Sequence, residues 1–177
     1  MKKIIFIAIA LLLQACSNTN YKPIDMAENV DIKQFMGEWY VIANIPTFIE
    51  LGAHNAIETY ELNDDRSVAT TFKFNQDAFD GELKVYEPTG FVSKDNTSLW
   101  GMQFIWPFKA EYIIAYVSED YQHTIIARSA RDYVWVMSRS PDITEGAYQS
   151  LVKRCVDMGY LESDIQRLPH KYPSKNL

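Results

Sequence analysis

Few residues of this 177-residue chain have the types and spacings that metal binding or nucleophilic catalysis requires. Its two cysteines, Cys16 and Cys155, lie far apart, and His54, His123 and His170 are scattered without the spacing of a metal site. No Gly-x-Ser-x-Gly sequence, the turn that presents a catalytic serine, occurs. We therefore expect no metal and no other cofactor, and we look to a single cysteine and to non-covalent binding for the function.

The first of these cysteines follows an N-terminal targeting sequence. Two lysines precede the apolar run 4–13, which is far shorter than the ~20 residues that span a bilayer, so residues 1–15 are predicted to be a signal peptide. Residues 13–16, Leu-Gln-Ala-Cys, resemble the bacterial lipobox. That resemblance implies cleavage before Cys16, diacylglycerol on its sulfur and acylation of the new amine, and the following Ser17 implies sorting to the outer membrane. The alternative is an ordinary secretory signal with Cys16 as a stray thiol.

Charge and composition limit the partners of the remaining chain. Residues 16–28 are predicted to be a lipidated tether, and residues 29–177 a single domain large enough for a real core. The net charge of −6 becomes −8 without Lys2 and Lys3, because 15 basic residues then face 23 acidic ones. An acidic chain without basic clusters is not expected to bind nucleic acid or to grip a membrane electrostatically. Membrane attachment must therefore be covalent or hydrophobic.

The elements that must position any binding site are mostly strands. Turn residues recur every 8–12 positions between runs of alternating hydrophobicity, which predicts an all-β antiparallel sandwich or barrel. Pro88 and Gly90 predict a kink or bulge in the fourth strand. The eight expected strands cover residues 37–45, 54–62, 68–75, 83–92, 99–106, 111–118, 122–129 and 134–139.

One helix is expected after the strands. Asp142 is a plausible N-cap with Glu145 three residues later, an apolar stripe including Cys155 follows, and Gly159 ends the pattern. This amphipathic helix must pack against the outside of the sheet, with Cys155 as a small buried hydrophobe. We also expect a helical turn within 29–35, a short strand within 165–168 and a frayed polar tail from His170 onward.

With these elements placed, Gly37-x-Trp39-Tyr40, Asp120-Tyr121 and Arg139 resemble, in position and order, the three signature regions of the lipocalins. Together with the lipobox, the chain is similar to the bacterial lipocalins, which are outer-membrane lipoproteins. The resemblance implies a closed eight-stranded antiparallel up-and-down β-barrel with one C-terminal α-helix on its outside. It also implies that Trp39 plugs the closed end beneath Arg139 in a cation–π contact. We interpret five of the motif residues as structural: Gly37, Trp39, Asp120, Tyr121 and Arg139.

Alternation along the strands predicts the side chains that line the barrel. The aromatic-rich faces are expected to point inward, which gives an apolar lining suited to a long acyl chain. The resemblance implies fatty acids or lysophospholipids as ligands, with Phe48 in a lid after the first strand. The alternative is that many of these aromatics simply fill the barrel. The predicted ligand-binding residues are Ala43, Phe48, Glu58, Tyr60, Phe72, Phe74, Trp100, Met102, Phe104, Tyr112, Ile114, Tyr116, Trp135 and Met137.

Glu58 is the exception in this lining because its carboxylate would lose solvation inside the barrel. One hypothesis places it near the open end, where it would contact a cationic or hydroxylated head group. The other is a bulge that turns it outward.

The sequence therefore predicts a protein that stores or transports lipids for membrane maintenance, anchored to the outer membrane through acylated Cys16 and facing the periplasm. Two such barrels could pair as a homodimer. The rival interpretations are a lipocalin-fold enzyme acting on a lipid, for which we find no nucleophile or acid–base pair, and a structural envelope lipoprotein with a filled barrel.

Overall fold

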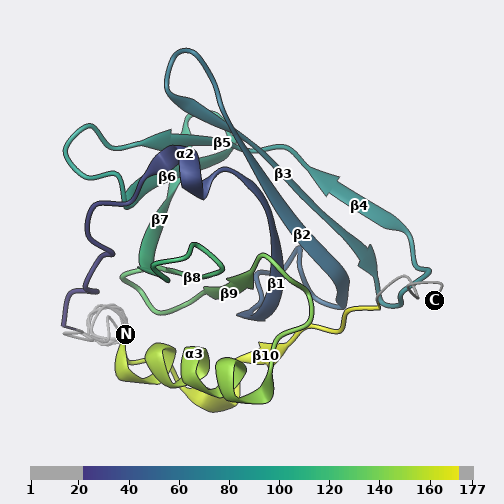
Figure 1. Cartoon of the computed structure of the whole chain (residues 1–177). Helices are drawn as coiled ribbons and strands as arrows, with labels where there is room; N and C mark the ends of the chain where they lie inside the picture. The colour runs from purple at the N-terminus through teal and green to yellow at the C-terminus, as the bar shows by residue number, and fades with distance from the viewer. Residues whose placement is uncertain (1–21, 172–177) are drawn as a thin grey trace, which may run out of the picture.

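The computed structural model describes residues 22–171 (Figure 1). The predicted signal peptide, Cys16 and most of the predicted tether lie outside the described residues. Within the described residues, no helix is long and apolar enough to cross a membrane.

The strands form one antiparallel sheet that closes on itself. Its order is β10-β1-β2-β3-β5-β6-β7-β8-β9, and β1 also pairs with β9, which completes a barrel. β4 and β5 both pair with β3 on either side of Glu87 and Pro88, so they act as one interrupted strand, as the kink prediction required. The predicted eight-stranded antiparallel barrel is confirmed. The strands are β1 (Gly37–Ile45), β2 (Ala53–Leu62), β3 (Ser67–Gln76), β4 (Leu83–Tyr86), β5 (Thr89–Val92), β6 (Leu99–Ile105), β7 (Phe108–Val117), β8 (His123–Ala127), β9 (Val134–Ser138) and β10 (Gln166–Arg167).

The two ends of the barrel differ. β1 starts beside the short helix α2 (Ile32–Phe35), which confirms the helical turn expected within 29–35 and lies across one end of the ring of strands (Figure 1). We call this the closed end. The Asp31 side chain caps α2 by accepting from the backbone N–H groups of Lys33 and Gln34, and Phe35 is completely buried. At the opposite end, the open end, lie the β1–β2, β3–β4, β6–β7 and β8–β9 connections.

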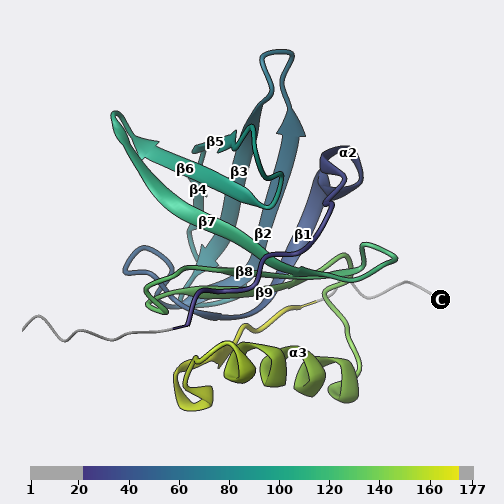
Figure 2. The same cartoon turned by 90° about the vertical axis from the view of Figure 1, so that its left-hand side faces the viewer.

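Helix α3 (Glu145–Asp157) lies against the outside of the barrel, beneath β8 and β9 (Figures 1 and 2). Leu151, Val152 and Cys155 form its buried stripe, and burial raises the pKa of the Cys155 thiol to about 12, so this cysteine packs as a hydrophobe. The predicted N-cap was wrong: the helix starts two residues later than an Asp142 cap requires, and the Thr144 hydroxyl accepts from the Ala147 N–H at 3.2 Å instead.

The chain after α3 returns to the barrel through a 3-10 turn, η2 (Glu162–Asp164), and β10. β10 pairs with the open half of β1, and Leu168 N–H donates to the Ile42 carbonyl at 2.8 Å, in the part where β2 has diverged from β1. The prediction of a polar tail from His170 was wrong for its first residue, because His170 Nε2 lies 2.8 Å from the Val41 carbonyl oxygen. Residues 172–177 lie outside the described part.

Two hydrophobic clusters share the barrel wall. One fills the interior, with Trp39, Tyr60, Trp100 and Tyr112 among its members. The other lies between the outer face of β7, β8 and β9 and helix α3, and includes Ile113, Ile125 and Cys155. Because β7, β8 and β9 contribute to both clusters, these strands are apolar on both faces.

Candidate functional site

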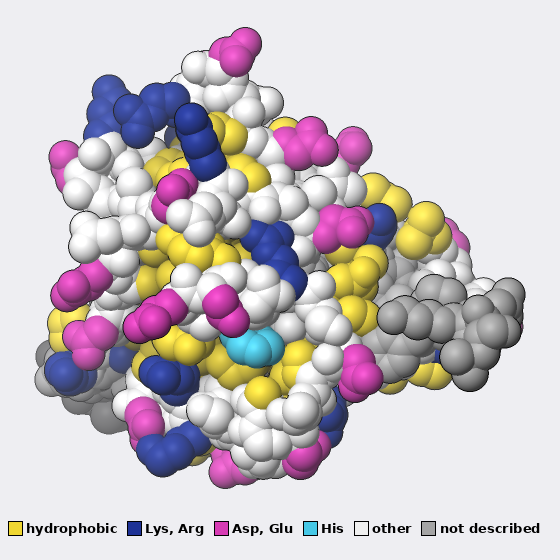
Figure 3. Space-filling view, viewed as in Figure 1, with side chains coloured by type: hydrophobic (Ala, Val, Ile, Leu, Met, Phe, Trp, Pro, Cys, Tyr) yellow, Lys and Arg dark blue, Asp and Glu magenta, His cyan; other side chains and the backbone are white. Residues whose placement is uncertain are grey.

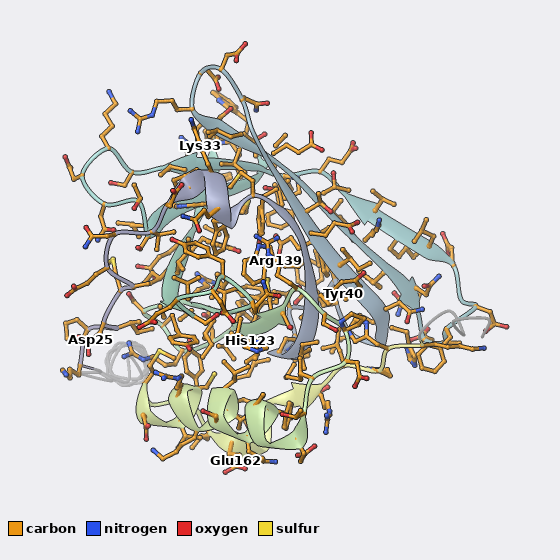
Figure 4. All side chains as sticks on the ribbon, in the orientation of Figure 1. Asp25, Lys33, Tyr40, His123, Arg139 and Glu162 are labelled. Atoms are coloured by element: carbon orange, nitrogen blue, oxygen red, sulfur yellow. The ribbon has the colours of Figure 1, made fainter. Side chains whose placement is uncertain are left out.

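The closed end is sealed by one tryptophan and one arginine. The guanidinium carbon of Arg139 lies 3.8 Å from the ring centroid of Trp39, which is the contact that the resemblance implied. Arg139 Nη2 also donates to the carbonyls of Gln34, Phe35 and Met36 at 2.8–3.1 Å. These carbonyls end helix α2, so the cation satisfies groups that a helix terminus leaves unpaired. Figure 4 shows Arg139 in the middle of this end.

The other signature residues hold this seal in place. Gly37 has φ +95°, and a Cβ there would lie 3.3 Å from Arg139 Nη1, so a side chain would be strained and crowded. The Tyr121 hydroxyl accepts from the Asp31 N–H at 2.8 Å, which joins the β7–β8 turn to the cap of α2. The Asp120 carboxylate accepts from the Ser118 hydroxyl and the Gln122 N–H, and these bonds lower its pKa. All three residues act on the scaffold.

Above the seal, interlocked aromatic rings occupy the closed half of the barrel. Phe35, Tyr60 and Trp100 contact one another with ring centroids 5.6–5.7 Å apart, and Tyr112 stacks on Trp100 at 5.5 Å. The hydroxyls of Tyr60 and Tyr112 hydrogen-bond to each other. Burial raises the pKa of both tyrosines well above the usual range, so both stay neutral.

Glu58 points into the barrel, as its phase predicted, but not near the mouth. It pairs with Trp39 across β1 and β2, in the closed half, and its side chain is buried. Burial raises the pKa of Glu58 to about 8. A hydrogen bond with Tyr60 opposes this rise, and the nearby Glu50 charge adds to it. The placement near the open end was therefore wrong, and so was the outward alternative. At neutral pH Glu58 is mostly a buried neutral acid.

A second buried carboxyl enters from the open end. Glu50 belongs to the loop between β1 and β2, yet only 6% of it is exposed. Its carboxylate accepts from Trp135 Nε1 at 2.8 Å and from the Thr47 N–H at 2.7 Å. Burial is the main cause that raises its pKa, and these hydrogen bonds oppose it. Glu50 thus ties the loop over the mouth to β9.

The remaining lining comes from the β3 side and from the strands opposite. Phe72, Phe74 and Tyr86 form a second group of rings, with centroids 5.3–6.4 Å apart. Met102, Ile114 and Met137 are buried in the same interior cluster. Together with the closed-half rings and Trp135, these residues surround an apolar interior whose polar groups include the Glu58, Glu50 and tyrosine oxygens.

Two predicted lining residues lie on the outside. Ala43 and Tyr116 belong to the cluster beneath α3, and the Arg154 guanidinium lies 4.1 Å from the Tyr116 ring centroid. The pairing of β1 with β9 shifts register between Val41 and Ala43, and that of β7 with β8 shifts between Ile114 and Tyr116. A bulge inserts one residue and reverses the faces beyond it, so strict alternation fails there.

Two further predicted lining residues are exposed at the open end. Phe104 is 51% exposed, after a register shift between Met102 and Ile105 in the β6–β7 pair. Phe48, expected in the lid, is 84% exposed. This loop joins β1 to β2 at the open end, where it turns Glu50 inward and Phe48 outward.

Sequence reasoning missed several interior residues. Val41 is in phase with Trp39, so alternation alone could have found it, and Ala56 is likewise in phase with Glu58. Phe35 enters from helix α2, and Glu50 from a loop, so no strand period applies to them. The signal for Glu50 was a lone charge in the apolar stretch 47–51.

The comparisons with known proteins agree with this architecture. The family model for the lipocalin-like domain matches residues 30–170, and the chain belongs to the lipocalin family. It is 29% identical to temperature-induced lipocalin-1 of Arabidopsis thaliana, over 89% of this chain and 87% of that one. It is 28% identical to the outer membrane lipoprotein Blc of Escherichia coli K12, over 85% and 86%. Among solved structures, insecticyanin from Manduca sexta covers 86% of both chains with a TM-score of 0.66 at 13% identity, which shows the shared fold.

Proposed function

We propose that this protein is an outer-membrane lipoprotein that stores or transports one lipid, a fatty acid or a lysophospholipid, inside its barrel for membrane maintenance. The observation that carries this proposal is the apolar interior, closed at one end by Trp39 and Arg139 and bordered at the other by the loop that Glu50 ties to Trp135. The names of the Blc relatives, outer membrane lipoproteins, support the location. Acylation of Cys16 would supply the anchor, with the domain facing the periplasm.

The interior suits an acyl chain better than a polar molecule. Each methylene that leaves water contributes about 0.8 kcal/mol, so a long chain supplies most of the binding free energy. The acyl chain of the lipid would run beside Phe72, Phe74, Met102 and Met137 toward the packed rings of the closed half. Binding is a reversible partition and needs no covalent step.

The polar head would remain at the mouth. There Glu50, rather than Glu58, is the carboxylate placed to meet a cationic or hydroxylated head group, because it comes from the covering loop. Entry of the ligand would require this loop to release Trp135. Deeper in the barrel, neutral Glu58 can donate a hydrogen bond to an ester or hydroxyl oxygen of a ligand that reaches it.

Native mass spectrometry of the chain from Ser17 onward, purified from cells, tests the proposal. We expect one co-purified lipid per protein, which delipidation removes and titration with lysophosphatidylethanolamine restores. A protein that arrives empty and takes up neither lysolipid nor fatty acid would contradict carrier function.

One specific observation favours a second candidate, a structural envelope lipoprotein with a filled barrel. The mutual ring contacts of Phe35, Trp39, Tyr60, Trp100 and Tyr112 occupy the closed half. The same titration decides between the two, because a filled barrel binds no lipid.

A further inference from the structure

The tip of the β6–β7 hairpin, residues 104–108, exposes its large apolar side chains to solvent. Ile105 is 74% exposed, Trp106 81% and Phe108 76%, and this five-residue segment carries no charge. Soluble proteins rarely leave such neighbours uncovered, so an exposed apolar patch of this kind indicates a surface that contacts something.

The same end of the barrel carries further exposed apolar residues. β1, β3 and β6 end there, whereas β2, β4 and β7 begin there, so the strand directions bring Phe48, Leu51 and Leu83 to the end that holds the hairpin tip. All three are more than half exposed. We call Phe48, Leu51, Leu83 and residues 104–108 the apolar rim. Figure 3 shows hydrophobic side chains gathered over β4, the strand that begins with Leu83.

The rest of the described surface lacks such a collection. At the closed end, the large exposed hydrophobic residue among those described is Leu62, and on the α3 side Val156 and Leu161 stand apart from the rim. The apolar surface is therefore concentrated around the mouth.

The described chain also begins at this end. The Lys22 carbonyl accepts from Arg131 Nη2 at 2.5 Å, and Arg131 lies in the β8–β9 turn at the open end. Figure 2 shows the described N-terminal segment leaving on the side from which the β6–β7 hairpin projects. Only five residues lie between Cys16 and Lys22, so the six residue-to-residue steps reach at most about 20 Å. An acyl anchor on Cys16 would therefore hold the open end, rather than the closed end, close to the bilayer.

We propose that the apolar rim inserts into the surface of a phospholipid bilayer, so that the mouth of the barrel faces the membrane. The occupant is a lipid surface because uncharged aromatic and aliphatic side chains around an opening match acyl chains, and because the acidic domain offers no electrostatic grip. The orientation rests on the proposed lipid anchor, but insertion of the rim itself does not. A lipid could then pass between bilayer and barrel without crossing water.

Vesicles test the proposal on the unacylated chain from Ser17 onward, which retains every described residue. The vesicles contain phosphatidylethanolamine and phosphatidylglycerol in a 3:1 ratio, and partition is measured by co-sedimentation. Trp106 serves as the reporter because it is 81% exposed, whereas Trp39 and Trp100 are buried and Trp135 is partly buried. We expect its emission to shift to the blue on vesicles and to be quenched by brominated acyl chains, with no loss of binding at high salt.

Two matched variants locate the contact. Ile105→Ser with Phe108→Ser should lower vesicle partition at least about tenfold, whereas Val156→Ser with Leu161→Ser, exposed apolar residues on the α3 side, should leave it unchanged. Trp106→Phe should abolish the blue shift and keep most of the partition. Circular dichroism confirms that each variant is folded.

Equal partition of the two double variants would overturn the proposal, as would a blue shift that survives in Trp106→Phe. A dimer that dissociates in Ile105→Ser with Phe108→Ser, while vesicle binding stays the same, would assign the rim to a second copy of the chain instead. Lipid uptake by the barrel is measured separately, so a failure of carrier function and a failure of rim insertion give different results.

Discussion

The two ends of the barrel differ in how far their large side chains are buried. At the closed end Trp39 is fully buried, and Arg139 over it donates to carbonyls of α2. At the open end Trp106 is exposed, and the β1–β2 loop is tied to β9 by the hydrogen bond between Glu50 and Trp135. The difference indicates that fold stability is concentrated at the closed end, and that the open end is left free to move and to make contacts.

The largest expected effect breaks the closed end. Arg139→Met removes the cation over Trp39 and leaves the carbonyls of Gln34, Phe35 and Met36 without their donor. We expect the free energy of unfolding, measured in denaturant, to fall by about 3 kcal/mol. Arg154→Met is the matched control, because it removes a guanidinium over Tyr116 on the outside of the barrel and should cost under about 1 kcal/mol. Equal losses would show that Arg139 at the closed end contributes no more to the free energy of unfolding than Arg154 does on the outside.

The next effect is a pH dependence located inside the closed half. The pKa of Glu58 is raised from 4.5 to about 8 in the folded protein, so its neutral form is the one that folding favours. Its contribution to stability is complete below pH 4.5 and is lost as the pH rises toward 8. Glu58→Gln, which cannot ionise, should remove this loss, so its stability advantage over the parent should grow steadily between pH 5 and pH 8.5.

Denaturant unfolding at pH 5, 6.5 and 8.5 measures this difference. Glu61→Gln, at an exposed position of the same strand, is the control and should follow the parent curve. Parallel curves for Glu58→Gln and the parent would show that Glu58 ionises as an ordinary exposed carboxyl does.

A smaller effect is expected at the mouth. Trp135→Phe keeps a ring but removes the N–H that donates to Glu50. Glu50→Gln replaces the carboxylate acceptor of that hydrogen bond with a neutral amide. A double-mutant cycle on stability should give a coupling of about 1–2 kcal/mol. If the loop gates the barrel, both variants should also exchange a bound fluorescent lysolipid several-fold faster than the parent. A coupling near zero would mean that the loop is held by other contacts.

Features that depend on local pattern could be predicted from the sequence, whereas features that depend on pairing between distant segments could not. Turn residues and alternating hydrophobicity determined the strands, and the signature residues Trp39 and Arg139 met as expected, because each depends on local pattern or on a known arrangement. Pro88 even marked the break between β4 and β5.

The failures lie where pairing between strands overrides the local pattern. Ala43, Tyr116 and Phe104 follow register shifts, and nothing in their own strands reveals where a partner strand inserts or omits a residue. Glu50 was missed for a related reason, since its partner Trp135 is 85 residues away in the sequence. The failures therefore follow register shifts and segments outside the strands, and they occur in both halves of the barrel.

The smallest expected effect on stability comes from Phe48, in the same loop as Glu50. Because Phe48 is 84% exposed, Phe48→Ser removes little packing and should change the free energy of unfolding by less than about 0.5 kcal/mol. Measuring Phe48→Ser and Arg139→Met in the same denaturant unfolding experiment places the smallest and the largest expected losses of stability on one scale. As part of the apolar rim, however, Phe48 should still matter on vesicles, where the same substitution should lower partition a few-fold. A destabilisation above about 1.5 kcal/mol would instead mean that Phe48 packs in the folded protein in solution, and that the open end is more tightly closed than its exposed side chains indicate.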